Sequence, residues 1–185
     1  MAASLTLICQ GETAAGRGSR FPDDEPLQAR EWQRARRLQS LVARYHTVWS
    51  APDAAARQTA SALSLPIVLA AELAEPDYGI WAGRPLREVM MQDADTFRTW
   101  LEGAPPPGGE SRVQLLARCG SWLNKRVDIQ GRHCAIASAS AIRAMIVNVL
   151  GAPPQSFERI DIHPLSITEL RSDGRRWHFC VFGER

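Results

Sequence analysis

Short apolar runs alternate with helix-like segments along nearly the whole of this 185-residue chain. The short runs are typical of buried strands, and the segments between them repeat apolar residues at the spacing of one helix face. The expected strands are residues 4–9, 46–49, 66–69, 134–137, 165–170 and 177–182, and the expected helices are residues 26–45, 53–63, 85–101, 111–123 and 142–150. This alternation predicts an α/β fold, a three-layer α/β/α sandwich with a mostly parallel sheet.

The end of the chain departs from that alternation. The last two expected strands flank Ser172-Asp173-Gly174, a turn sequence that predicts a closing hairpin. The length suits one domain with one hydrophobic core, and the sequence contains no internal repeat or low-complexity tract. We therefore expect a single domain over residues 1–185.

Composition and charge exclude several classes of partner. Apolar residues make up 45% of the chain and charged residues 23%, and the net charge is +2, which gives no reason to expect nucleic acid. The apolar run from Ser4 to Ile8 lacks a basic flank and is too short for a signal peptide, and no run approaches a membrane span. The cysteines and the four histidines lack metal-binding spacing. We expect a cytoplasmic protein with reduced cysteines, no metal and no cofactor.

The expected topology also predicts where a ligand would bind. In open α/β sheets, ligands bind beyond the carboxyl ends of the strands. The loop after Cys9, the start of the helix at Asp53 and the loop after Ala137 should therefore meet at one pocket.

Five sequence motifs follow one another along nearly the full length of the chain. They are Leu7-Ile8-Cys9-Gln10-Gly11-Glu12-Thr13, Val48-Trp49-Ser50-Ala51-Pro52 with Gln58-Thr59-Ala60, Leu73-Ala74-Glu75 with Gly79-Ile80-Trp81-Ala82-Gly83, Pro107-Gly108-Gly109-Glu110-Ser111 with Arg118, and Ile136-Ala137-Ser138-Ala139-Ser140-Ala141-Ile142-Arg143. In this order they resemble the motifs of the histidine phosphatase superfamily, which includes the cofactor-dependent phosphoglycerate mutases. The resemblance implies that family's sandwich fold and a phosphomonoester hydrolase or mutase that works through a phosphohistidine.

The reactive positions of that family are changed in this chain. Where the resemblance expects the nucleophilic and second histidines, the chain has Gln10 and Ser138, and where it expects the two phosphate-binding arginines, it has Cys9 and Ala55. A glutamine amide cannot carry a labile phosphoryl group. Of the usual catalytic set, only the acid persists, as Glu75.

Two interpretations of different class follow. The first is a binding or scaffold protein, as a monomer or a homodimer, that lacks phosphohistidine chemistry and keeps a pocket for a small anion. The second is an enzyme with a rebuilt site that uses Glu75, His163 or Cys9. The first is favoured because the four changed positions are small or neutral, whereas phosphoryl transfer needs positive charge.

Each candidate residue also has a structural interpretation. Cys9 is either a thiolate nucleophile or a buried core residue, Glu75 either a general acid or a structural hydrogen-bond partner, and His163 either a relocated base or a surface residue. An anion would be held by the loop at Gly11 and Thr13 and by nearby arginines, which otherwise lie on solvated surface. The candidate arginines are Arg17, Arg20, Arg57 and Arg143.

Overall fold

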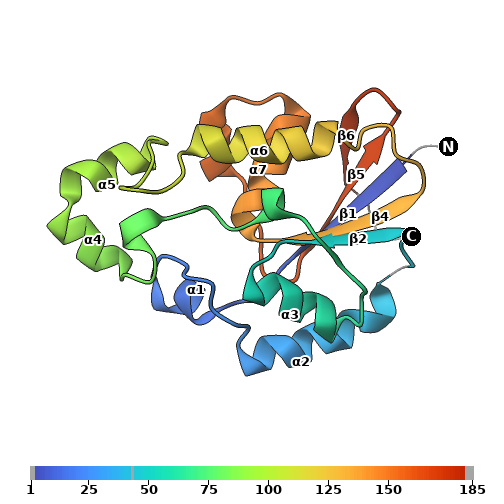
Figure 1. Cartoon of the computed structure of the whole chain (residues 1–185), viewed down its shortest axis with the longest axis horizontal. Helices are drawn as coiled ribbons and strands as arrows, with labels where there is room; N and C mark the ends of the chain where they lie inside the picture. The colour runs from blue at the N-terminus through green and yellow to red at the C-terminus, as the bar shows by residue number, and fades with distance from the viewer. Residues whose placement is uncertain (1–2, 43, 182–185) are drawn as a thin grey trace.

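The computed structural model describes residues 3–42 and 44–181, and its centre is a mixed sheet (Figure 1). Within these residues the sheet has six strands in the order β3-β2-β4-β1-β5-β6. The strands are β1 (Ala3–Cys9), β2 (Thr47–Ser50), β3 (Val68–Leu69), β4 (Arg132–Ala137), β5 (Ile167–Ser172) and β6 (Trp177–Cys180). Strands β1 to β4 pair in parallel, whereas β5 and β6 are antiparallel and form the predicted hairpin.

Helices cover both faces of this sheet, which confirms the predicted three-layer α/β/α fold. Helices α2 (Ala29–Leu38) and α3 (Ala54–Ala62) pack together on one face, and α6 (Arg112–Asn124) and α7 (Ala139–Leu150) pack together on the other (Figure 1). The short helix α1 (Ala14–Gly18) follows β1, while α4 (Leu86–Gln92) and α5 (Ala94–Leu101) form a lobe beside the sandwich. Four 3₁₀ helices are Gln39–Leu41, Ala71–Leu73, Gly79–Trp81 and Pro154–Arg159.

The central strands supply the core. Leu5 and Leu7 of β1 and Ala135 and Ile136 of β4 have no exposed surface, because helices cover both sides of these strands. The near-continuous apolar runs in the sequence have the same cause. None of the described helices is long and apolar enough to cross a lipid bilayer.

Two helix boundaries follow the sequence closely. Ser111 begins α6 through a capping box, in which its hydroxyl accepts from the Gln114 amide and the Gln114 side chain accepts from the Ser111 amide. Gly151 ends α7 in the left-handed conformation (φ 58°), which glycine adopts without a side-chain clash.

Two expected helices are wrong in extent. The segment 85–101 is divided into α4 and α5, because Asp93 has a non-helical backbone (φ −138°, ψ 49°) that ends one helix and begins the next. The segment 26–45 is helical only from Ala29, and it ends in the 3₁₀ turn Gln39–Leu41 before the extended Val42. Part of the last expected strand, residue 182, lies outside the described residues.

The lobe is joined to the sandwich by an aromatic cluster. The ring of Phe21 lies 5.2 Å from Tyr78 and 5.3 Å from both Trp81 and Trp100, centroid to centroid. Trp81 is fully buried, and Phe97 of α5 packs against it at 6.2 Å. Such aromatic pairs stabilise their geometry beyond the area they bury. The cluster thereby fixes Tyr78 beside the carboxyl end of the sheet.

Candidate functional site

A cavity of about 440 Å³ lies beyond the carboxyl ends of β1 and β4. In the register of these parallel strands Cys9 lies opposite Ala137, and the main-chain N–H of Gln10 donates to the Ala137 carbonyl at 2.9 Å. The cavity is lined by Cys9, Gln10, Gly11, Glu12, Thr13, Gly16, Pro22, Glu75, Tyr78, Ala139, Ser140, Arg143, Ile162 and Pro164. An adjoining cavity of about 40 Å³ shares Gln10, Thr13, Pro22 and Glu75 with it and adds Asp24, Glu25, Asp53 and Ala55.

The loop after β1 is held by side chains from the helices beneath it. The Gly11 amide donates to the Thr59 hydroxyl at 3.0 Å, and the Glu12 amide donates to the carboxylate of the fully buried Glu31 at 3.3 Å. A Cβ atom on Gly11 would lie 2.9 Å from the end of the Leu27 side chain and 3.1 Å from the Cβ atom of Glu31, so a larger residue would require these side chains to shift. The Gly11 amide, which the sequence had suggested as an anion donor, and the Glu12 amide are therefore already bonded within the protein.

The start of α7 forms another wall. Ser138 is the N-cap, 1% exposed, and its hydroxyl accepts from the Ala141 amide at 3.2 Å. The Ser138 and Ser140 hydroxyls hydrogen-bond to Glu75. Ser138 thus has a structural role at the helix start and a second role in holding the acid.

The backbone around Glu75 is fixed by a partly buried ion pair. Arg118 of α6 pairs with Glu110 at 2.7 Å, and it donates to the carbonyls of Glu72 at 2.7 Å, Ala74 at 2.9 Å and Glu75 at 3.4 Å. The Glu75 amide in turn donates to the Asp53 carboxylate at 3.1 Å. Arg118 and Glu110 appear in one of the sequence motifs, but the bonds of Arg118 to main-chain carbonyls left no sequence signal.

Glu75 is the strongest candidate for a proton-transfer group. Burial, and then the nearby Asp53 carboxylate, raise the pKa of Glu75 to about 7, against the opposing effect of the two serine hydroxyls. Burial also raises the pKa of Asp53. A carboxyl group that titrates near neutrality can both donate and accept a proton under physiological conditions.

Cys9 lines the cavity but is only 2% exposed. Burial, and then the Glu75 charge, raise the pKa of its thiol to about 12. The thiol is therefore protonated at neutral pH, which favours the core interpretation of Cys9 over the thiolate one.

His163 lies outside the cavity lining, although its neighbours Ile162 and Pro164 belong to it. Its side chain is 80% exposed and lies 3.8 Å from the Asp161 carboxylate. This location corresponds to the surface interpretation and not to a relocated base.

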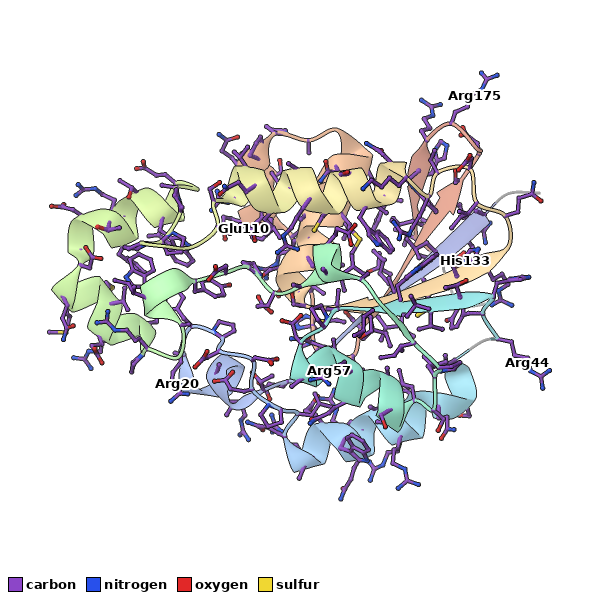
Figure 2. The ribbon with its side chains drawn as sticks, viewed as in Figure 1. Arg20, Arg44, Arg57, Glu110, His133 and Arg175 are labelled. Atoms are coloured by element: carbon purple, nitrogen blue, oxygen red, sulfur yellow. The ribbon has the colours of Figure 1, made fainter. Side chains whose placement is uncertain are left out.

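Three of the four candidate arginines do not line either cavity. Arg17 donates to Gln28 at 3.3 Å, Arg20 pairs with Glu25 at 3.2 Å, and Arg57 donates to the Pro52 carbonyl at 2.8 Å. Arg20 and Arg57 are exposed (Figure 2). The three arginines therefore do not line the site as expected, although Arg17 also lies 4.0 Å from Glu12 and Arg20 pairs with Glu25, and these two acids line the larger and the smaller cavity.

Arg143 is the exception among the four candidate arginines. It lines the larger cavity one turn after Ser140, and it lies 3.5 Å from the exposed carboxylate of Asp161. Its Nε is buried without a hydrogen-bond partner, and so is the Oε1 of Gln10 in the same cavity. Two residues of the cavity wall thus each carry a buried polar atom with no partner among the described residues, one a donor and one an acceptor. No group of three His, Cys, Asp or Glu side chains within the described ranges is arranged to hold a metal ion.

The fold and the position of this cavity define an α/β/α protein with a site at the carboxyl edge of its sheet. The family profile of the histidine phosphatase superfamily (branch 1) matches residues 5–184. The chain belongs to that superfamily.

Curated relatives and solved structures agree with this assignment. A bifunctional protein of Mycobacterium tuberculosis is 31% identical over 121 residues, covering 62% of this chain and 33% of that protein, so the chain matches about a third of that relative's length. Phosphoserine phosphatase 1 of Hydrogenobacter thermophilus is 25% identical over 167 residues, covering 83% of this chain and 78% of that enzyme.

Among solved structures, an α-ribazole-5′-P phosphatase of Escherichia coli superposes with a TM-score of 0.90 at 22% identity, covering 100% of this chain and 98% of that chain. A mycobacterial glucosyl-3-phosphoglycerate phosphatase superposes with a TM-score of 0.86 at 22% identity, covering 98% and 99%. At this identity the superpositions establish the shared fold alone.

Proposed function

We propose that this chain is a small-molecule-binding member of the superfamily that does not form a phosphohistidine. The observation that carries the proposal is the amide side chain of Gln10 in the cavity wall, at the position that the family resemblance gives to the nucleophilic histidine. A delocalised amide is not a phosphoryl acceptor. No histidine is found among the described residues that line either cavity.

The charges of the cavity support the same proposal. Glu12 and Glu75 line the larger cavity, and Arg143 is the only cation among its described lining residues. Phosphoryl transfer relies on several positive groups that offset the charge of the transition state. Cys9 and Ala55, at the positions corresponding to the two phosphate-binding arginines, supply none.

The ligand that suits this cavity is a small anion with a single charge. Each missing charged hydrogen bond removes about 1.5–3 kcal/mol of binding free energy. Two missing arginines therefore leave inorganic phosphate with a dissociation constant in the millimolar range at best, on the order of what a single arginine supports.

A second candidate function is an enzyme that uses Glu75 as its acid or base. The observation in its favour is the pKa of about 7 for Glu75, held beside Ser140 and an open cavity. A positioned general acid or base contributes about 10²–10⁴-fold to a rate. Neither expected nucleophile or base is available to this enzyme. The thiol of Cys9 stays protonated, and His163 lies outside the cavity lining.

One experiment addresses both candidates. Purified protein is assayed with p-nitrophenyl phosphate and with phosphoserine, and it is tested for an acid-labile phosphoenzyme. The Glu75→Gln variant is the site-directed comparison, and Arg57→Gln, altered on the exposed face of α3, controls for contaminating phosphatases. We expect equal, background turnover for all three proteins. Turnover that is retained by Arg57→Gln and lost in Glu75→Gln contradicts the binding-protein proposal and supports the enzyme.

A further inference from the structure

A second hollow lies between the lobe and the sandwich. Its volume is about 60 Å³, and its walls include the side chains of Trp100 from α5, Leu115 from α6 and Phe157 from the 3₁₀ helix that follows α7. Since one water molecule needs about 10–15 Å³ by this measure, the hollow holds roughly four to six atoms of that size, about one six-membered ring. Glu110, Ser111, Arg112 and Glu158 also line the hollow, so its apolar walls have a polar rim.

This hollow adjoins the polar cavity. Tyr78 and Ser140 line both of them, so these two side chains form the shared wall. The ring of Tyr78 is held against Phe21, and its hydroxyl hydrogen-bonds to Ser140. A ligand that occupied both the polar cavity and the hollow would therefore contact Tyr78 and Ser140.

Arg143 stands at the junction of the two spaces. Its guanidinium carbon is 5.8 Å from the centre of the Phe157 ring, and Phe157 lines the hollow. The Nε atom of Arg143 is buried and has no hydrogen-bond partner among the described residues. Its Nη2 is 3.5 Å from Asp161.

The second arginine near Phe157 differs from Arg143. The guanidinium of Arg112 lies 5.5 Å from the Phe157 ring, but it pairs with Glu158 at 2.5 Å and donates to the Leu101 carbonyl at 3.0 Å. Arg112 is thus held by two close partners, whereas Arg143 pairs with the exposed carboxylate of Asp161 at the longer distance of 3.5 Å, and we take Arg143 as the anion-binding group.

From this juxtaposition we propose that the site takes a small carboxylate that carries an aromatic or aliphatic ring. The carboxylate accepts from Arg143, as a guanidinium binds carboxylates in a fixed geometry, and the ring fills the hollow between Trp100, Leu115 and Phe157. The inference rests on the proposed function, because it supplies the ligand class for the same cavity. It concerns binding alone and includes no covalent step.

The test is an NMR titration of the full chain with matched probes. The probes are 3-phenylpropionate, propionate, which lacks the ring, and 3-phenylpropanol, which lacks the charge. Burial of the ring is expected to make 3-phenylpropionate bind about 10- to 100-fold more tightly than propionate. Loss of the charge is expected to weaken 3-phenylpropanol by about 10-fold or more relative to 3-phenylpropionate.

Two variants assign the two halves of the ligand. Ala104→Leu places added methyl groups at the wall of the hollow, and we expect it to remove the preference for the ring while leaving propionate binding unchanged. Arg143→Gln is expected to weaken both acids and to leave 3-phenylpropanol unchanged. Arg57→Gln is the matched surface control, and a dispersed spectrum verifies that each variant is folded.

Several results overturn the inference. These are equal affinity for the two acids, binding of neither, a ring preference that persists in Ala104→Leu, or tighter binding of 3-phenylpropanol than of 3-phenylpropionate. Failure of the proposed function is seen separately, as Glu75-dependent phosphomonoester turnover, which leaves the probe series unaffected.

Discussion

The amide of Gly11 donates a hydrogen bond to the hydroxyl of Thr59 at 3.0 Å, joining residues that are 48 positions apart in the chain. The same hydroxyl donates to the Ala55 carbonyl at 2.7 Å within α3. The loop that lines the cavity is therefore tied to the helix beneath it without help from a ligand. This bond defines the cavity's shape and uses an amide that an anion would otherwise need.

The first prediction follows from this bond. Thr59→Val keeps the side-chain volume but removes the acceptor, and it leaves the Gly11 amide buried without a partner. We expect a loss of about 1–3 kcal/mol in the free energy of unfolding, measured by urea denaturation. The control is Thr99→Val on the exposed surface of α5, where the hydroxyl bonds only to the Thr96 carbonyl. Equal effects of the two substitutions would show that the Gly11–Thr59 bond contributes little.

The second prediction concerns the pH dependence of stability. The folded pKa of Glu75, about 7, lies above its ordinary value of 4.5, so the folded protein binds the proton more tightly than the unfolded chain. The contribution of this group is complete below pH 4.5 and is lost as the pH rises to 7. At pH 8 the charged, buried carboxylate destabilises the fold by up to about 3 kcal/mol.

Glu75→Gln removes this titration. We expect urea denaturation of the variant to vary less between pH 4.5 and pH 8 than that of the wild-type chain, with the variant relatively more stable at pH 8. Parallel stability curves for the two proteins would rule out the raised pKa.

The third prediction tests Arg118, which pairs with Glu110 and donates to main-chain carbonyls around Glu75. The positive charge of Arg118 lowers the pKa of Glu75, against the larger effect of burial. In Arg118→Gln the carboxyl should therefore titrate at a higher pH than in the wild-type chain. Because Glu110 also loses its partner, stability should fall by about 2–4 kcal/mol.

The measurement for this variant is the carbon-13 shift of the labelled Glu75 carboxyl across pH. Arg98→Gln is the matched control, since Arg98 pairs with the exposed Asp95 of the same helix at 2.9 Å. An unchanged titration of Glu75 in Arg118→Gln would show that the charge of Arg118 does not influence the pKa of Glu75.

Much of the fold was predictable because the central strands are buried on both faces. The apolar runs of these strands are local signals. The helix start at Ser111 and the helix end at Gly151 are also local signals, and the structure has both boundaries where the sequence predicts them. The break at Asp93 was not predictable, because it consists of one residue with a non-helical backbone in a segment, residues 86–101, that contains neither glycine nor proline. The short helix α1 has too few residues for a periodic signal.

The site was predictable where it depends on strand ends. Cys9, Gln10, Gly11 and Thr13 meet Glu75 at the cavity because parallel strands bring their carboxyl ends to one edge. The arginines were not predictable in the same way. Arg17 in α1 and Arg20 after it pair with Glu12 and Glu25, which line the two cavities, but neither arginine lines a cavity itself.

The last prediction concerns the reactivity of the cysteines. Burial raises the pKa of the thiols of Cys9 and Cys119 to about 12 and also raises that of Cys134, whereas Cys180 on the edge strand β6 is partly exposed. Because the thiolate is the reacting species, a disulfide reagent at pH 8 should label native protein rapidly at one thiol, and denatured protein at all four. Cys180→Ser should abolish the rapid phase, and Cys9→Ser should leave it unchanged. Rapid labelling that disappears in Cys9→Ser would instead mean that the cavity thiol is ionised, and it would restore Cys9 as a nucleophile for the rebuilt enzyme.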